Sequence, residues 1–155
     1  MAIRNVVKEG DDVLRKTARP VTDFGTRLHT LLDDMAETMY EQNGVGLAGN
    51  QVGVLRRVVV IDVGEGLIEL VNPEIVKYSG KQEEVEGCLS CPGEYGIVKR
   101  PMAVTVKAQD RFGEYRTYEG EGLLARCFCH ELDHLDGVIY KDKATRMLMP
   151  DEIEA

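Results

Sequence analysis

The segment His130-Glu131-Leu132-Asp133-His134 has the residue types and spacing that point most directly to chemistry. On an α-helix, positions four residues apart differ by about 40° around the axis, so both imidazoles leave one face and can bind one metal ion. Glu131 lies about a quarter turn away, which suits a carboxylate that handles the proton of a water on the metal without binding the metal. The segment therefore predicts a metal site; the alternative is a pair of solvated or core histidines.

A third ligand has to come from elsewhere, and the candidates are the four cysteines. Cys127 and Cys129 belong to the same helical segment and are badly placed to share tetrahedral geometry with the histidines. Cys88 follows a glycine, which lets the backbone approach closely, and one Cys with two His and an open fourth position is typical of a catalytic site. A closed structural site that also uses Cys91 is an alternative, but it would leave Glu131 without a task.

Cys88-Leu89-Ser90-Cys91 also has the CxxC spacing of a redox dithiol. That chemistry needs a reactive cysteine at a helix N-terminus, and Pro92-Gly93 disfavours a helix start there. We therefore expect Cys91, Cys127 and Cys129 to be small buried apolar residues.

Two helices and a set of strands must position these residues. Apolar residues at helical spacing predict a helix over residues 26–42, capped by Thr26 and ended by Asn43-Gly44. A second helix is predicted over residues 121–135, closed at Asp136-Gly137. Short β-branched runs separated by Gly, Pro, Asn and Asp predict antiparallel strands; they cover residues 58–63, 67–71, 74–78, 97–98, 103–106 and 115–118. The sequence predicts an α+β fold, with mostly antiparallel sheets packed around the helix that carries HExxH.

Length and charge narrow the class of protein further. The 155 residues, 43% of them hydrophobic and 30% charged, predict a single domain over residues 1–155. Nineteen Lys and Arg against 27 Asp and Glu give a net charge of −8, which argues against nucleic-acid binding. No apolar run approaches the ~20 residues that a membrane span needs. We therefore expect a soluble, cytoplasmic protein that binds neither nucleic acid nor membranes.

Three motifs follow one another in a particular order: GVGLAGNQ at 44–51, EGCLS at 86–90 and HELDH at 130–134. Together they resemble the peptide deformylases, whose motifs read GxGLAAxQ, EGCLS and HExDH in that order. The segment at 10–15 is also similar to the N-terminal GxxxLR of that family, so the resemblance covers nearly the whole chain.

The resemblance implies a metal site and a catalytic set. It implies that Cys88, His130 and His134 bind the metal. Glu131 would act first as a general base and then as a general acid. The Gln51 side chain and the backbone N–H of Leu89 would bind the oxyanion. The resemblance implies one divalent metal ion, Fe(II) first, with nickel, cobalt or zinc as substitutes. The implied substrate is the N-formyl group on the starting methionine of new polypeptides, with formate released. A thiolate ligand would make the ferrous form sensitive to oxygen.

Further residues are candidates for substrate binding. The candidates that would contact the methionine side chain are Val45, Leu123, Arg126 and Cys127. Gly46, in the adjacent glycine-rich loop, is a further candidate. The peptide backbone would pair, as an added strand, with a strip that comprises Gly87, Gly93, Glu94 and Tyr95. The Arg126 guanidinium either makes the pocket less apolar or extends outward with only its stem in the wall. Gly49 stands where the family usually has alanine, and we expect it to loosen the loop with modest consequences for Gln51.

The resemblance also bears on partners. Relatives that dock on the ribosome do so through a long basic C-terminal helix, whereas residues 151–155 here are acidic. We therefore expect N-formylated nascent peptides as partners and at most transient ribosome contact. Two functions of other classes remain as alternatives: a zinc endopeptidase, for which a thiolate ligand would be unusual, and a non-catalytic metal-binding module, which would leave Glu131 and Gln51 without a task.

Overall fold

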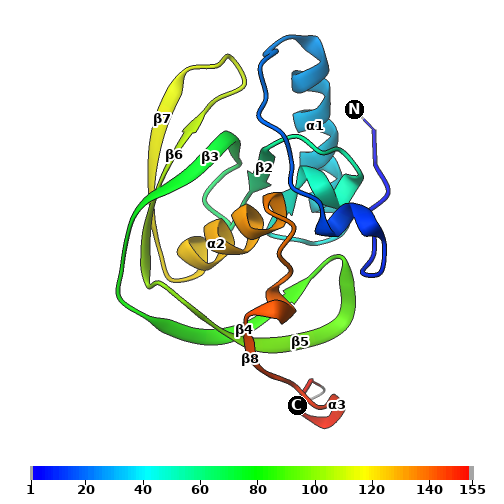
Figure 1. Ribbon diagram of the computed structural model, residues 1–155, viewed down its shortest axis with the longest axis vertical. Helices are drawn as coiled ribbons and strands as arrows, with labels where there is room; N and C mark the ends of the chain where they lie inside the picture. The colour runs from blue at the N-terminus through cyan, green and yellow to red at the C-terminus, as the bar shows by residue number, and fades with distance from the viewer. Residues whose placement is uncertain (1, 154–155) are drawn as a thin grey trace.

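Two antiparallel sheets and two main helices form the molecule, which a computed structural model describes over residues 2–153 (Figure 1). The five-stranded sheet has the order β1 (Gly46–Ala48), β2 (Val58–Ile61), β3 (Ile68–Ser79), β6 (Ala103–Gln109) and β7 (Tyr115–Glu121). The three-stranded sheet has the order β4 (Gln82–Cys88), β5 (Cys91–Arg100) and β8 (Ala144–Met147). The helices are α1 (Thr26–Glu41), α2 (Leu123–Leu135) and the short α3 (Pro150–Ile153), with 3-10 turns η1 (Asp12–Arg15), η2 (Gly49–Val52) and η3 (Tyr140–Asp142). The predicted α+β class is confirmed.

Strand β2 lies at the centre of the fold, and this explains its unbroken run of apolar residues. All four of its residues are fully buried. Val58 and Val60 pack with α1, while Val59 and Ile61 pack with α2. Because successive side chains of a strand point to opposite faces, the two helices cover opposite faces of the sheet.

Helix α2 carries residues 130–134 and is buried on nearly all sides. It contacts strands of both sheets, so its polar residues must find partners inside the protein. The helix ends before Gly137, which has a φ of +76°. A Cβ at that position would lie 2.5 Å from the backbone oxygen of Arg15, so the predicted glycine stop also permits a close approach of two chain segments.

Helix α1 begins and ends close to the predicted positions, but its predicted cap is wrong. The N-cap residue is Gly25, without a side-chain cap hydrogen bond, and Thr26 is the first helical residue. The predicted apolar stripe is buried against the sheet.

Three strands differ most from the prediction. β4 was not predicted at all, β5 only at residues 97–98, and β8 not at all. β4 reads QEEVEGC and exposes most of its residues, so it lacks the β-branched run on which strand prediction depends. The runs predicted at 67–71 and 74–78 form one strand, β3, with a register shift between Val71 and Glu74.

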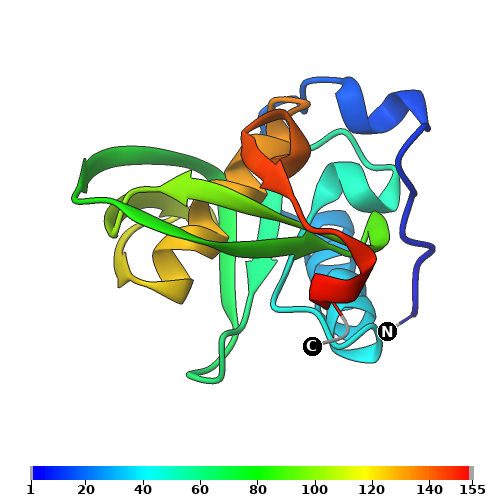
Figure 2. The same ribbon diagram turned by 90° about the horizontal axis from the view of Figure 1, so that it is seen from below.

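The β4–β5 hairpin reaches past α2 toward α1, as the view from below shows (Figure 2). Leu89 at its tip packs against the apolar cluster beneath α1. The hairpin therefore holds the EGCLS segment beside both α2 and the glycine-rich segment. Within residues 2–153, no helix has the length and apolar character needed to cross a membrane.

Candidate active site

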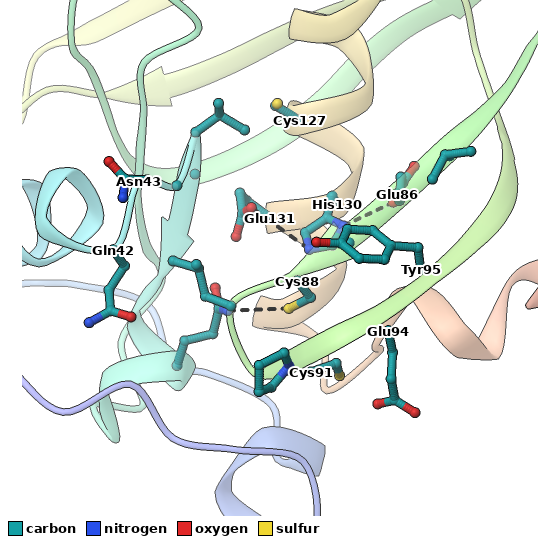
Figure 3. A pocket seen from close by; sticks show the side chains of 18 of the residues that line it. Gln42, Asn43, Glu86, Cys88, Cys91, Glu94, Tyr95, Cys127, His130 and Glu131 are labelled. Carbon is teal, nitrogen blue, oxygen red and sulfur yellow. Dashed lines mark hydrogen bonds and ion pairs between the residues drawn. The ribbon is translucent and has the colours of Figure 1, made fainter. Parts of the chain in front are cut away.

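A cavity of about 560 Å³ opens between α2, β1 and the β4–β5 hairpin (Figure 3). Every substrate-binding candidate from the sequence lines it: Val45, Gly46, Gly87, Gly93, Glu94, Tyr95, Leu123, Arg126 and Cys127. Five residues expected to act on the metal or the substrate line it as well: Gln51, Cys88, Leu89, His130 and Glu131. The fold thus brings three distant sequence segments to one cavity.

The three expected metal ligands converge at the base of this cavity. Ligand atoms of Cys88, His130 and His134 all lie within 4.8 Å of one another, and the Cys88 Sγ is 3.3 Å from the His134 Nε2. His134 is fully buried directly behind the cavity wall. One sulfur and two nitrogens around one point fit a transition-metal ion that keeps an open coordination position.

Glu86 orients the first of these histidines, a role the sequence analysis missed. Its Oε1 accepts a hydrogen bond from the His130 Nδ1 at 2.9 Å, so the Nε2 remains free to face the cavity. Burial opposes ionisation of Glu86, but hydrogen bonds from His130 and Arg100 outweigh it and hold the pKa at about 2. The carboxylate therefore stays ionised beside the metal site.

Arg100 extends this network to Asp133, three residues after His130 on α2. Its Nε and Nη2 donate to both oxygens of Glu86 at 2.9 and 3.0 Å. Its Nη1 donates to the Asp133 Oδ2 at 2.7 Å, and the other Asp133 oxygen accepts from the Lys143 Nζ at 3.1 Å. Asp133 is therefore a structural partner of the hairpin and not merely a solvated helix charge.

The depressed pKa of Glu86 predicts how stability depends on pH. A carboxyl whose pKa falls from 4.5 to about 2 on folding stabilises the protein above pH 4.5 and loses that contribution as the pH falls through 2. Comparison of the free energies of unfolding of the metal-free protein and Glu86→Gln should show a clear gap at pH 5. The gap should close between pH 4.5 and 2, and a gap that has already closed by pH 5 would contradict the assignment.

Arg126 follows neither expected alternative. The side chain lines the cavity, but it is only 5% exposed. Its guanidinium pairs with the Glu86 carboxylate and donates to the Val98 backbone oxygen at 3.2 Å. The charge is neither free in the cavity nor in solvent, because Glu86 neutralises it, and only the stem of Arg126 is left to line the cavity.

Glu131 has the environment of a proton acceptor. The side chain is buried, its Oε2 lies 3.9 Å from the His130 Nε2, and burial raises its pKa to about 7. A Cβ at Gly46 would lie 2.6 Å from that Oε2, so the glycine makes room for the carboxylate. Within residues 2–153 the buried Oε1 has no hydrogen-bond partner, which leaves it free to accept a proton.

Gln51 is held with its amide aimed at the metal site. Its Oε1 accepts from the Ala48 backbone N–H at 3.0 Å, and its Nε2 donates to the Ser90 Oγ at 3.2 Å and to the Cys88 Sγ at 3.4 Å. Ser90, which the sequence analysis did not single out, is fully buried and fixes this orientation. The Gln51 amide nitrogen is therefore held at hydrogen-bond distance from one of the expected metal ligands.

Gly49 does not loosen its loop, in contrast to the expectation from the sequence. A Cβ there would lie 2.6 Å from the Arg56 backbone oxygen and 2.8 Å from the Val54 backbone oxygen. Backbone must move to admit a methyl group, so Gly49→Ala should lower the free energy of unfolding by ~1–3 kcal/mol. Denaturant unfolding of the variant and the wild type measures this; equal stability of the two proteins would contradict the packing argument.

The remaining cysteines are buried free thiols, as predicted. Cys91, Cys127 and Cys129 are 2%, 5% and 6% exposed. Cys91 opens strand β5 and not a helix, so the setting that a thioredoxin-like motif requires is missing.

The buried carboxylate beside a Cys-His-His ligand set, at the base of a cavity large enough for a peptide end, defines a metal-dependent hydrolase. The sequence model of the polypeptide deformylase family matches residues 3–148, and the chain belongs to this family. Peptide deformylases are metalloenzymes that remove the N-formyl group from new polypeptides, and this chain is a hydrolase of that kind.

Individual relatives agree in sequence and in structure. The peptide deformylase of Thermoanaerobacter pseudethanolicus is 62% identical over 154 residues, which cover 99% of this chain and 97% of the relative. A crystal structure of a peptide deformylase from Legionella pneumophila has 47% identity and a TM-score of 0.90, covering 99% of this chain and 90% of that one. The Thermotoga maritima structure has 42% identity and a TM-score of 0.92, covering 94% and 99%.

Proposed function

We propose that Cys88, His130 and His134 bind the divalent metal ion of this deformylase, and that Glu131, Gln51 and the Leu89 N–H carry the hydrolysis. The observation that carries the proposal is the convergence of the three ligand atoms within 4.8 Å of one another, with the Glu131 carboxylate beside them. We further propose that residues 1–155 act as one catalytic domain, since the cavity takes its lining from residues 8 to 131.

Each group in the site would have a separate role in the hydrolysis. When bound, the metal ion supplies Lewis acidity that lowers the pKa of a water and polarises the formyl carbonyl. Glu131, with its pKa near neutrality, accepts the proton of the attacking water and delivers it to the departing amine. The Gln51 Nε2 and the Leu89 N–H donate hydrogen bonds to the carbonyl oxygen as it gains charge. The products are formate and a free methionyl amine.

The rest of the cavity would hold the peptide. Val45, Leu123, Cys127 and the stem of Arg126 offer apolar surface to the methionine side chain. The peptide backbone would pair along the hairpin strip at Gly87 and Gly93 to Tyr95 as an added strand. A Cβ at Gly87 would lie 2.7 Å from the Tyr95 ring, so this glycine lets the ring pack onto the strip.

We propose Fe(II) as the metal, with nickel, cobalt or zinc as substitutes. A sulfur ligand and two imidazoles suit all four ions, and the Cys88 thiolate makes the ferrous form vulnerable to oxidation. Ferrous protein exposed to air should lose its formate-releasing activity while protein loaded with nickel keeps it under the same conditions. Equal loss from both forms would contradict this explanation of oxygen sensitivity.

The partners of this site follow from its chemistry. N-formylated nascent peptides are the substrates, and the contact with the ribosome is at most transient. Formylated nascent chains of this kind are met in the cytoplasm, which is the location we propose.

Formate release from a formyl-methionyl tripeptide tests the function. Protein prepared without oxygen and loaded with ferrous iron or nickel should release formate rapidly and should leave the unformylated tripeptide intact. Cleavage of an internal peptide bond in the unformylated substrate would favour an endopeptidase. A folded, metal-replete protein that releases no formate and cleaves no peptide would favour a metal-binding module.

A further inference from the structure

Cys88 and Cys91 oppose each other at the closed end of the β4–β5 hairpin. They are register partners across a two-residue turn. Opposed residues of an antiparallel pair have Cα atoms about 4.5–5.5 Å apart, and a disulfide spans Cα separations of about 4.4–6.8 Å. Their side chains leave the same face of the hairpin. A bond between the two sulfurs therefore requires side-chain rotation and little backbone movement.

Cys88, the cysteine that an oxidant would attack first, lies at the cavity wall. Cys88 is half-buried, and both cysteines line the cavity wall (Figure 3). A peroxide molecule, only slightly larger than water, can enter a space of about 560 Å³. Cys91 has no part in the proposed hydrolysis, so its thiol beside Cys88 is unexplained by that function.

We propose that Cys91 is the resolving cysteine of Cys88, so that peroxide oxidation of Cys88 ends in a reversible Cys88–Cys91 disulfide. This inference rests on the proposed function in one respect, because Cys88 is there a metal ligand. It differs from the thioredoxin-like interpretation, since the pair protects this site and does not oxidise other proteins.

The reaction balances with hydrogen peroxide as the oxidant. The Cys88 thiolate attacks one peroxide oxygen, the O–O bond breaks, and a sulfenic acid forms with loss of hydroxide, which takes a proton from the medium. The Cys91 sulfur then attacks the Cys88 sulfur, the S–S bond forms, and the S–O bond breaks. The hydroxyl group leaves with the Cys91 proton as water. Two thiols are oxidised by two electrons in total and one peroxide is reduced to two waters.

The disulfide would remove the metal as well as protect the sulfur. Only a thiolate is an effective sulfur ligand here, so the oxidised pair leaves two histidines to hold the ion. A dithiol reductant restores both thiols and the binding site. Without Cys91, the sulfenic acid would proceed to the sulfinic and sulfonic acids, which the reductant cannot reverse.

Peptide mapping separates these outcomes because trypsin places the cysteines on two peptides. Residues 82–99 contain Cys88 and Cys91, and residues 127–141 contain Cys127 and Cys129. The metal-loaded protein is treated with hydrogen peroxide, alkylated and digested, while a chromogenic chelator records released metal. We expect the 82–99 peptide to be lighter by two hydrogen atoms and unalkylated, with the 127–141 peptide alkylated twice.

Three cysteine variants test whether Cys91 resolves the oxidised Cys88. In Cys91→Ala, Cys88 should gain two or three oxygen atoms, and the reductant should restore metal binding ~10-fold less than in the wild type. Cys91→Ser is the second variant should the alanine change prevent folding. Cys129→Ala, which removes a buried cysteine outside the cavity lining, should behave as the wild type.

Wild-type protein in which Cys88 is over-oxidised while Cys91 is alkylated would overturn the proposal. A disulfide that forms and releases the metal supports it. A disulfide that forms with no loss of metal supports the pairing and contradicts the role of Cys88 as a ligand, so failure of the inference and failure of the metal assignment are distinguishable.

Discussion

Replacement of Glu131 by glutamine is expected to lower the rate of formate release by at least ~100-fold, because general acid–base catalysis contributes roughly 10²–10⁴. Glutamine fills nearly the same volume beside Gly46 but can neither accept the proton of the attacking water nor deliver one to the amine. The turnover number on a formyl-methionyl tripeptide measures the effect. The metal content of the variant should equal that of the wild type, since Glu131 is not a proposed ligand.

Two comparisons make this result specific. Glu121→Gln, at an exposed position just before α2, should retain wild-type turnover. Glu131→Gln should also not destabilise the metal-free protein above pH 7, because burial raises the pKa of this carboxyl to about 7 and its ionisation there opposes folding. A variant that keeps its turnover would show that another group moves the proton.

The second large effect is expected at Glu86. Glu86→Gln removes the carboxylate that forms ion pairs with Arg100 and Arg126. Both arginines are buried, each with 5% of its surface exposed. Breaking a buried ion pair from one side costs about 3–5 kcal/mol because it leaves uncompensated charge. The free energy of unfolding should therefore fall by that amount, as measured by denaturant titration at pH 7.

The same substitution should weaken metal binding. The His130 ring loses the acceptor that fixes its tautomer, and changes in such supporting groups typically cost 10–100-fold in metal affinity. Glu84→Gln is the matched control, since this residue lies two positions earlier on the same strand with its side chain exposed. Wild-type stability and affinity in Glu86→Gln would refute the network that we describe.

The sequence predicted the helices and strands whose apolar residues recur at a regular spacing or form a continuous run. Helical spacing revealed α1 and α2 within two residues at each end, and the buried run at 58–61 revealed β2. By contrast, β4 alternates glutamates with few apolar residues and lies largely in solvent, and β8 is four residues long with partial burial. These strands are fixed by their pairing with β5, which is information about tertiary structure and not about local pattern.

The candidate site shows the same division. His130, Glu131 and His134 belong to one dense local motif, so their spacing suggested their chemistry. Cys88 was selected from four cysteines and was then implied by the resemblance to the peptide deformylases. The ion pairs of Glu86 with Arg100 and Arg126 join residues 14 and 40 positions apart, and such pairs leave no periodic signal. The local sequence offered one sign, an acidic residue inside a motif, and that sign could not reveal that the Arg126 guanidinium is buried against Glu86.

The most direct test of the site is X-ray absorption of the zinc-loaded protein at the zinc edge. We expect one sulfur at about 2.3 Å, two imidazole nitrogens at about 2.0–2.1 Å and one further oxygen from solvent. Cys88→Ser should lose the sulfur scatterer, whereas Cys91→Ala should keep it. Two sulfur ligands in the wild type would mean that Cys91 closes the coordination sphere, and the proposal of an open catalytic site held by Cys88, His130 and His134 would be wrong.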